Sequence, residues 1–89
     1  MVTSIILLTT DRLKVNEVAE KLTQVDGISE VYSVSGNYDL VAVARVAHND
    51  ALADMVTNAF VGIDGIESTD TMLAFKAYSK HDLDSMFSG

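Results

Sequence analysis

The chain has 89 residues and no cysteine, and its formal net charge at pH 7 is −7. This length allows one domain with a single hydrophobic core, and the lack of cysteine excludes a disulfide scaffold and a thiolate metal site. Only six residues are lysine or arginine, which argues against direct binding to nucleic acid, because these cations largely drive binding to phosphate. The apolar run 5–8 is far too short to cross a membrane, and no segment resembles a signal peptide, so we expect a cytoplasmic protein with no membrane partner.

The first part of the chain predicts a strand, a helix and a second strand. Residues 2–9 have the composition of a strand. Apolar residues then recur at helical spacing over about 11–24, with a threonine and an aspartate able to cap the start and Gly27 beyond the end. Over 32–35, Tyr32 and Val34 alternate with two serines, which predicts a half-buried strand.

A polar loop then leads into the most apolar part of the sequence. Gly36 and Asn37 tolerate positive φ, so the chain can reverse there. The nearly unbroken apolar run 40–46 predicts a central strand that is covered on both faces. Tyr38 and Asp39 would therefore be held at the end of a rigid sheet, which is a natural position for ligand contacts.

The second part of the chain repeats this plan. We predict a helix from about residue 49 or 50 to residue 61, followed by a last strand over about 71–77. The turn motif Val25-Asp26-Gly27-Ile28 returns as Ile63-Asp64-Gly65-Ile66, each time between a helix and a strand. Two β-α-β units of this kind predict an α+β, ferredoxin-like βαββαβ fold, in which two helices cover one face of a four-stranded antiparallel sheet. The uncovered face predicts pairing with another sheet in an oligomer.

The residues that carry chemistry give no pattern of a catalytic, metal or cofactor site. His48 and His81 lack acidic neighbours at metal-ligand spacing, and no phosphate loop or serine elbow is present. Asp39 has two open interpretations, a hydrogen bond within its own turn or contact with a ligand. The hydroxyls of Thr69 and Thr71 are either ordinary strand residues or contacts to a bound polar group.

Two segments resemble one known family. Residues 31–40 and 65–71 are similar to the V-T-G-x-x-D hairpin and the G-V-x-x-T-x-T strand start of the RAM domain, the effector-binding part of Lrp/AsnC transcription regulators. Ser35 and Ile66 replace the usual threonine and valine, and both changes nearly keep shape and polarity. The resemblance covers the chain from residue 2 to about 79. Because no helix-turn-helix precedes the first strand, the chain resembles the stand-alone RAM proteins.

The resemblance implies a dimer that joins two sheets in an α+β barrel, frequently assembled as four dimers in a ring, with small amino acids bound between dimers. Asp39 would receive the ligand ammonium, backbone N–H groups near Gly36 its carboxylate, and Tyr38 would cover its side chain. The implied ligand-binding residues are Gly36, Asn37, Tyr38, Asp39, Thr69 and Thr71.

We therefore expect a non-catalytic, oligomeric amino-acid-binding module at residues 1–79, without a cofactor, that modulates full-length Lrp/AsnC relatives by mixed assembly. Residues 80–89 form a tail in which Leu83, Met86 and Phe87 have the spacing of one helical turn. One alternative is a small dimeric α+β-barrel enzyme of the monooxygenase or haem-handling kind. Its cavity needs an inward-facing polar residue, and the sequence offers none apart from Arg45, which could point either way from its strand. The other is an ACT-type regulatory domain, which shares the fold and the ligand class.

Overall fold

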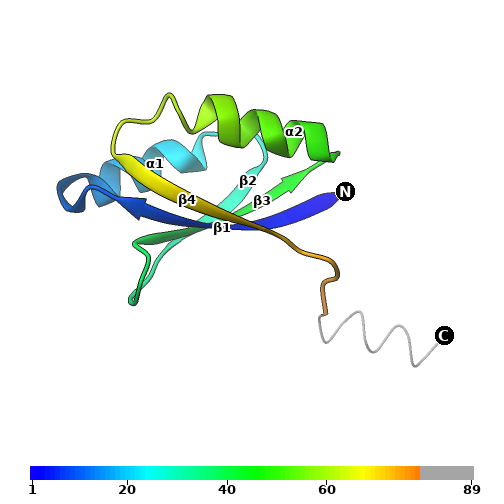
Figure 1. Cartoon of the computed structure of the whole chain (residues 1–89), viewed down its shortest axis with the longest axis horizontal. Helices are drawn as coiled ribbons and strands as arrows, with labels where there is room; N and C mark the ends of the chain where they lie inside the picture. Colours follow the sequence, from blue (N-terminus) through cyan, green and yellow to red (C-terminus); the bar gives the residue numbers. More distant parts are fainter. Residues whose placement is uncertain (79–89) are drawn as a thin grey trace.

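The fold is described from a computed structural model, and the structure describes residues 1–78. Its element order is β1 (Val2–Thr10), a 3₁₀ helix (Arg12–Lys14), α1 (Val15–Thr23), β2 (Ile28–Ser33), β3 (Leu40–Val46), α2 (Asn49–Asp54), a π-helical turn (Met55–Ala59) and β4 (Ile66–Leu73). Both helices lie on one side of the sheet (Figure 1). The described residues form no helix that is long and apolar enough to span a membrane.

The four strands are antiparallel to their neighbours in the order β2-β3-β1-β4. Each β-α-β unit therefore connects two parallel strands that are separated by one strand of the other unit. This interleaved arrangement is the split β-α-β plan, and it confirms the predicted ferredoxin-like α+β fold. The edges of the sheet are β2 and β4.

The central strand β1 separates the core from the open face. Its residues are alternately buried and half-buried, so Ile6 and Leu8 are fully buried while Ile5 and Leu7 are not. Burial of such a side chain stabilises the fold by about 1.5–3 kcal/mol. The core under the helices consists of Ile6, Leu8, Val18, Leu22, Leu40, Ala42, Ala44, Leu52, Met55 and Phe60.

The repeated Asp-Gly-Ile motif forms two equivalent turns. Gly27 and Gly65 have φ values of 96° and 107°, a region that favours glycine because it has no Cβ. The carbonyl oxygen of Gly27 accepts a hydrogen bond from the Arg45 N–H (2.7 Å), and that of Gly65 accepts one from the Asp11 N–H (2.8 Å). Each turn thus fastens the start of an edge strand to the end of the neighbouring strand.

The helices differ in detail from the prediction. The helix expected at 11–24 begins as a 3₁₀ helix, and the Asp11 Oδ1 atom caps it by accepting a hydrogen bond from the Leu13 N–H (3.0 Å). The helix expected to reach residue 61 changes to a π-helical turn, in which the Phe60 N–H donates to the Met55 carbonyl (3.0 Å). Periodicity alone does not reveal such a change, because the apolar stripe continues through it.

The predicted bounds of the last strand, 71–77, are only partly correct. The strand β4 begins at Ile66 and ends at Leu73, which is paired with Ser4 near the start of β1. Beyond it, the Ala74 N–H makes one more hydrogen bond, to the Thr3 carbonyl (2.9 Å). Phe75, which was placed in this strand, is 98% exposed. The helical turn expected at 80–89 lies outside the described residues.

The two glycines Gly36 and Gly65 give a matched test of the turns. Both have positive φ, so an alanine at either position strains the backbone by about 1–3 kcal/mol. A Cβ at Gly65 would also lie 2.9 Å from Cγ2 of the buried Val18, whereas a Cβ at Gly36 meets no atom within 4 Å. Chemical denaturation should therefore show a larger loss of unfolding free energy for Gly65→Ala than for Gly36→Ala. Equal losses would contradict the described packing of the Gly65 turn.

Candidate ligand-binding site

Asp39 fastens the loop between β2 and β3 to the central strand. Its backbone N–H donates to the Leu8 carbonyl (2.9 Å), and its own carbonyl accepts from the Val34 N–H (3.2 Å). Its side-chain Oδ2 atom accepts from the Thr10 N–H (2.8 Å). Asp39 therefore has a structural role, in which the carboxylate takes the place of a strand partner at the end of β1.

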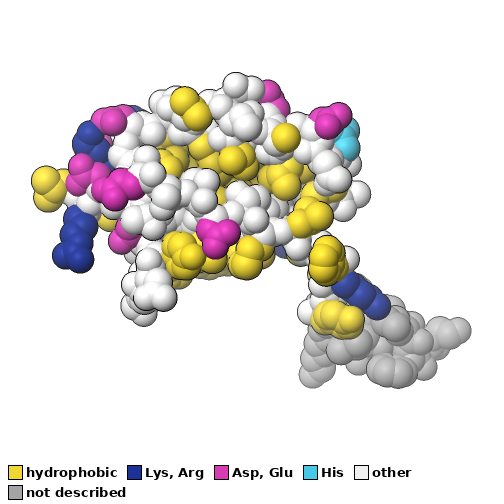
Figure 2. Space-filling view, viewed as in Figure 1, with side chains coloured by type: hydrophobic (Ala, Val, Ile, Leu, Met, Phe, Trp, Pro, Cys, Tyr) yellow, Lys and Arg dark blue, Asp and Glu magenta, His cyan; other side chains and the backbone are white. Residues whose placement is uncertain are grey.

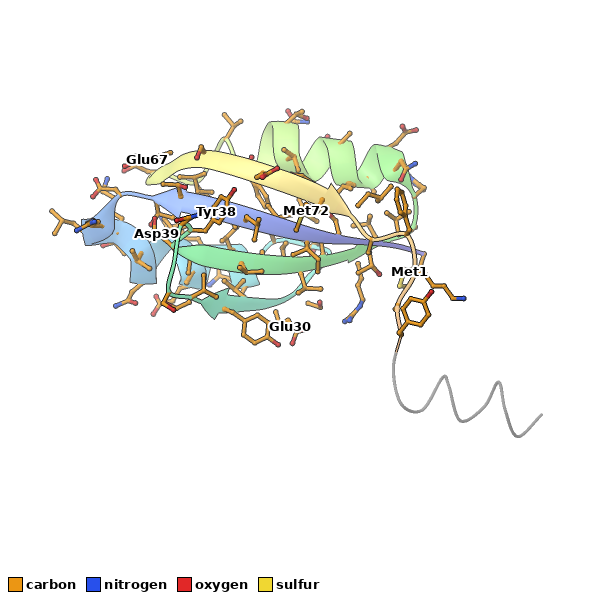
Figure 3. The ribbon with its side chains drawn as sticks, turned by 60° about the horizontal axis from the view of Figure 1, so that its bottom comes forward. Met1, Glu30, Tyr38, Asp39, Glu67 and Met72 are labelled. Atoms are coloured by element: carbon orange, nitrogen blue, oxygen red, sulfur yellow. The ribbon has the colours of Figure 1, made fainter. Side chains whose placement is uncertain are left out.

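Tyr38 connects the same loop to the far edge of the sheet. Its hydroxyl donates to Oδ2 of Asp70 in β4 (3.2 Å). Asp70 is paired with Leu7, so this contact crosses β1 on the face that is turned away from the helices. Figure 3 brings this open face forward, with Tyr38 and Met72 on it. The hydrogen bond to Asp70 and its negative charge raise the pKa of Tyr38 above its ordinary value.

The tip of the loop is formed by Gly36 and Asn37. Both residues are exposed, and Gly36 has a φ of 115°. The loop projects from the sheet on the side opposite to the helices (Figure 1). Its backbone groups are thus presented at the rim of the open face, where a second molecule can reach them.

Thr69 and Thr71 lie on the other face of the sheet. They are paired with Leu8 and Ile6, whose side chains are buried beneath the helices, so their own side chains point to the helix side. Thr71 lines a hollow of about 380 Å³ between α2 and β4, and Thr69 lines an adjoining hollow of about 330 Å³. Neither hollow includes a residue of the 36–39 loop.

The six candidate residues thus form two groups within one chain. The loop group (residues 36–39) stands at the rim of the open face, and the threonine group (Thr69 and Thr71) lies on the helix side of β4. Leu8 connects the two groups, because its carbonyl accepts a hydrogen bond from the Asp39 N–H and it is paired with Thr69. A single chain therefore does not bring all six residues to one face of the sheet.

Sequence reasoning missed several contributors to these surfaces. Leu52 and Val56 line the hollow beside Thr71, although their helical spacing was interpreted only as a core stripe. Asp70 was not singled out, because nothing in the sequence links it to Tyr38.

A further hollow of about 550 Å³ lies between the end of α1 and α2, beside Gly27 and Met55. The described residues contain no group of three His, Asp or Glu side chains suited to a metal ion.

These features define a small α+β domain with ligand-sized hollows beside an edge strand and a polar loop at the rim of an open sheet. A model of the Lrp/AsnC ligand binding domain matches residues 3–83. The chain belongs to this family.

Relatives and solved structures agree with this assignment. The HTH-type transcriptional regulator FL11 of Pyrococcus furiosus is 37% identical over 70 residues, which is 75% of this chain and 44% of the regulator. The chain therefore spans less than half the length of this curated relative. The crystal structure of TTHA0845 from Thermus thermophilus superposes with a TM-score of 0.84 at 38% identity, over 90% of this chain and 100% of that one.

A more distant structure shares the fold alone. The transcriptional regulator NMB0573 of Neisseria meningitidis, solved as a complex with L-Met, has a TM-score of 0.78 at 12% identity, over 88% of this chain and 52% of that one.

The contact between Tyr38 and Asp70 predicts a selective change in tyrosine ionisation. In Asp70→Asn the negative charge is lost, so the pKa of Tyr38 should fall towards its ordinary value of about 10. Because the folded-state pKa is raised, this contact stabilises the fold below pH 10, and the contribution is lost as the pH rises through the folded-state pKa. NMR of ring-labelled tyrosine against pH measures the change.

The control for this titration is Tyr32, whose pKa is raised by its hydrogen bond to Glu30. Its ionisation should stay unchanged in Asp70→Asn and should shift downwards in Glu30→Gln. An unaltered Tyr38 titration in Asp70→Asn would show that this phenol does not face Asp70 in solution.

Proposed function

We propose that this domain binds a small amino acid as an effector and acts as a non-catalytic sensing module of the Lrp/AsnC type. The observation that carries the proposal is the family match over residues 3–83. The L-Met complex of the distant regulator NMB0573 is consistent with this ligand class. We propose regulation of transcription, through full-length relatives, as the corresponding role, and the cytoplasm as the location in which the protein would act.

The chemistry of the loop group and of the threonine group supports an amino acid as the ligand. Asp39 uses its Oδ2 atom for the Thr10 N–H, and a carboxylate has further acceptor positions for a ligand ammonium. Backbone N–H groups around Gly36 would receive the ligand carboxylate, and the hydroxyls of Thr69 and Thr71 would add hydrogen bonds. Tyr38, which is held by Asp70, would cover the ligand.

The open face supports a dimer of two sheets. Its residues on β1, β3 and β4 are apolar over a continuous area: Ile5, Leu7, Val41, Val43 and Met72. Such a face would be shielded from water by a second copy of the chain. The segment 74–78, which contains the exposed Phe75, turns towards this same side (Figure 1). We further propose that four such dimers assemble in a ring. We also propose mixed assembly with a full-length relative, and co-elution of the two proteins from a sizing column tests this second proposal.

The enzyme alternative has little support in the described residues. Arg45 lies on the open face, where its Nη1 atom donates to the Ser29 hydroxyl (3.3 Å). It would therefore point into the cavity of a dimeric barrel, as that alternative requires. Asp70 of β4 shares this face, but its carboxylate already accepts a hydrogen bond from the Tyr38 hydroxyl (3.2 Å), and no histidine lies on the described strands. A binding module therefore explains the site better.

The ligand proposal predicts that loss of the Thr69 hydroxyl weakens the binding of the amino acid. A thermal-shift screen of the twenty amino acids should give a hit, because a ligand that binds the native state raises its apparent stability. Thr69→Val keeps the shape of the side chain and removes one hydrogen bond, so it should weaken binding by about 2- to 12-fold. Thr23→Val is the control, because Thr23 lies at the end of α1 and lines neither hollow. Absence of any hit at millimolar concentration would contradict the proposal.

The dimer proposal predicts different outcomes for two equal changes of charge. Met72 lies on the open face and is 46% exposed in the single chain, so Met72→Glu should fold. A carboxylate buried between two sheets is costly, and the dimer should therefore dissociate at least about 100-fold more readily. Leu13→Glu is the matched control, because Leu13 is 91% exposed in the 3₁₀ helix. Analytical ultracentrifugation that finds the same dimer in both variants would exclude the open face as the interface.

A further inference from the structure

An apolar groove runs between α2 and the edge strand β4. It consists of the hollows beside Thr71 and Thr69, which share Val56 as a common wall. Figure 2 shows hydrophobic side chains gathered in this groove. The residues that line it are Asn49, Leu52, Ala53, Val56, Thr57, Phe60, Val61, Ile63, Ile66, Glu67, Ser68, Thr69, Thr71 and Leu73.

The helix presents apolar side chains to this groove at regular spacing. Leu52, Val56 and Phe60 follow one another at intervals of four residues, so they line the same side of the helix. Thr57 also lines the groove, but its hydroxyl already donates to the Ala53 carbonyl (2.7 Å). The helix side of the groove therefore offers few free polar groups. The polar groups on the strand side are the hydroxyls of β4.

The charge of the groove restricts the ligand further. Among residues 1–78, no lysine, arginine or histidine lines either hollow, and Glu67 is the only charged residue that does. A ligand with an acidic side chain would find no cation among these lining residues and would be repelled by Glu67 and by the net charge of −7. A hollow of about 380 Å³ is at the small end of the range for ligand pockets, about 300–1,000 Å³.

We propose that the effector is an amino acid with an aliphatic side chain, and that this side chain lies in the groove against Val56. This inference rests on the proposed function, and it names the ligand class of the same site. The amino and carboxyl groups would stay at the β4 side, near Thr71, where the 36–39 loop of a second chain would bring Asp39 and the N–H groups around Gly36 to them. Val56 is then a specificity-determining residue, because it forms the wall shared by both hollows.

A series of unbranched amino acids tests the inference by calorimetry. Alanine, 2-aminobutyrate, norvaline and norleucine differ by one methylene at each step. Each buried methylene should lower the Kd about fourfold. Glutamate, which matches norvaline in length but carries a charge, should bind at least tenfold more weakly than norvaline.

Variants of Val56 test the position of the side chain. Val56→Phe fills part of the hollow, so it should weaken the binding of norleucine at least tenfold and leave the affinity for alanine nearly unchanged. Val56→Ala leaves more space and should weaken norleucine severalfold, which keeps the test valid if the phenylalanine variant does not fold. Leu13→Phe is the control, because Leu13 lies in the 3₁₀ helix and lines neither hollow.

The outcomes separate this inference from the proposed function. A rising affinity along the series that Val56→Phe abolishes supports both. Tighter binding of glutamate or lysine than of norleucine, or equal affinity along the series, overturns the aliphatic inference and leaves amino-acid sensing intact. No binding of any amino acid by the assembled protein contradicts the proposed function and, with it, the inference.

Discussion

The pairing of β4 with the central strand β1 decides on which face of the sheet the candidate ligand residues of β4 lie. Because Thr69 and Thr71 are opposite Leu8 and Ile6, they face the helices and the groove beside α2. Asp70, one residue along, is opposite Leu7 and faces away from the helices. A shift of one residue in this register would exchange the two faces, so the chemistry of the site depends on the packing of β1.

Asp39 holds the loop between β2 and β3 in place through its backbone and its carboxylate. Its hydrogen bonds to Leu8, Thr10 and Val34 hold the loop against the end of β1, so the loop is positioned before any ligand binds. Preorganisation of this kind lowers the entropy cost of binding. The loop group and the threonine group nevertheless lie on opposite sides of the sheet. This separation is consistent with the proposed site that two chains complete, and such a site would link ligand binding to assembly.

Local pattern in the sequence was enough to predict the fold, but not the positions of the site residues. The repeated Asp-Gly-Ile motif and the apolar stripe of each helix predicted the order of the elements, because both signals are local. Both ends of β4 were misplaced, since they depend on its pairing with the distant strand β1, and the π-helical turn left the helical stripe unbroken. The contact between Tyr38 and Asp70 joins distant segments, so only the assembled sheet reveals it. For the same reason, Val56 was recognised as apolar but not as a wall of the groove.

The central claim is that an aliphatic amino acid binds where the threonine group and the loop group of two chains meet. A crystal structure of the assembled protein with norleucine tests it most directly. The account predicts a ligand whose side chain contacts Val56, whose polar groups contact Thr69 or Thr71, and whose other side contacts the 36–39 loop of a second chain. A ligand found instead in the hollow beside Gly27 and Met55, away from β4 and from the loop, would contradict the account.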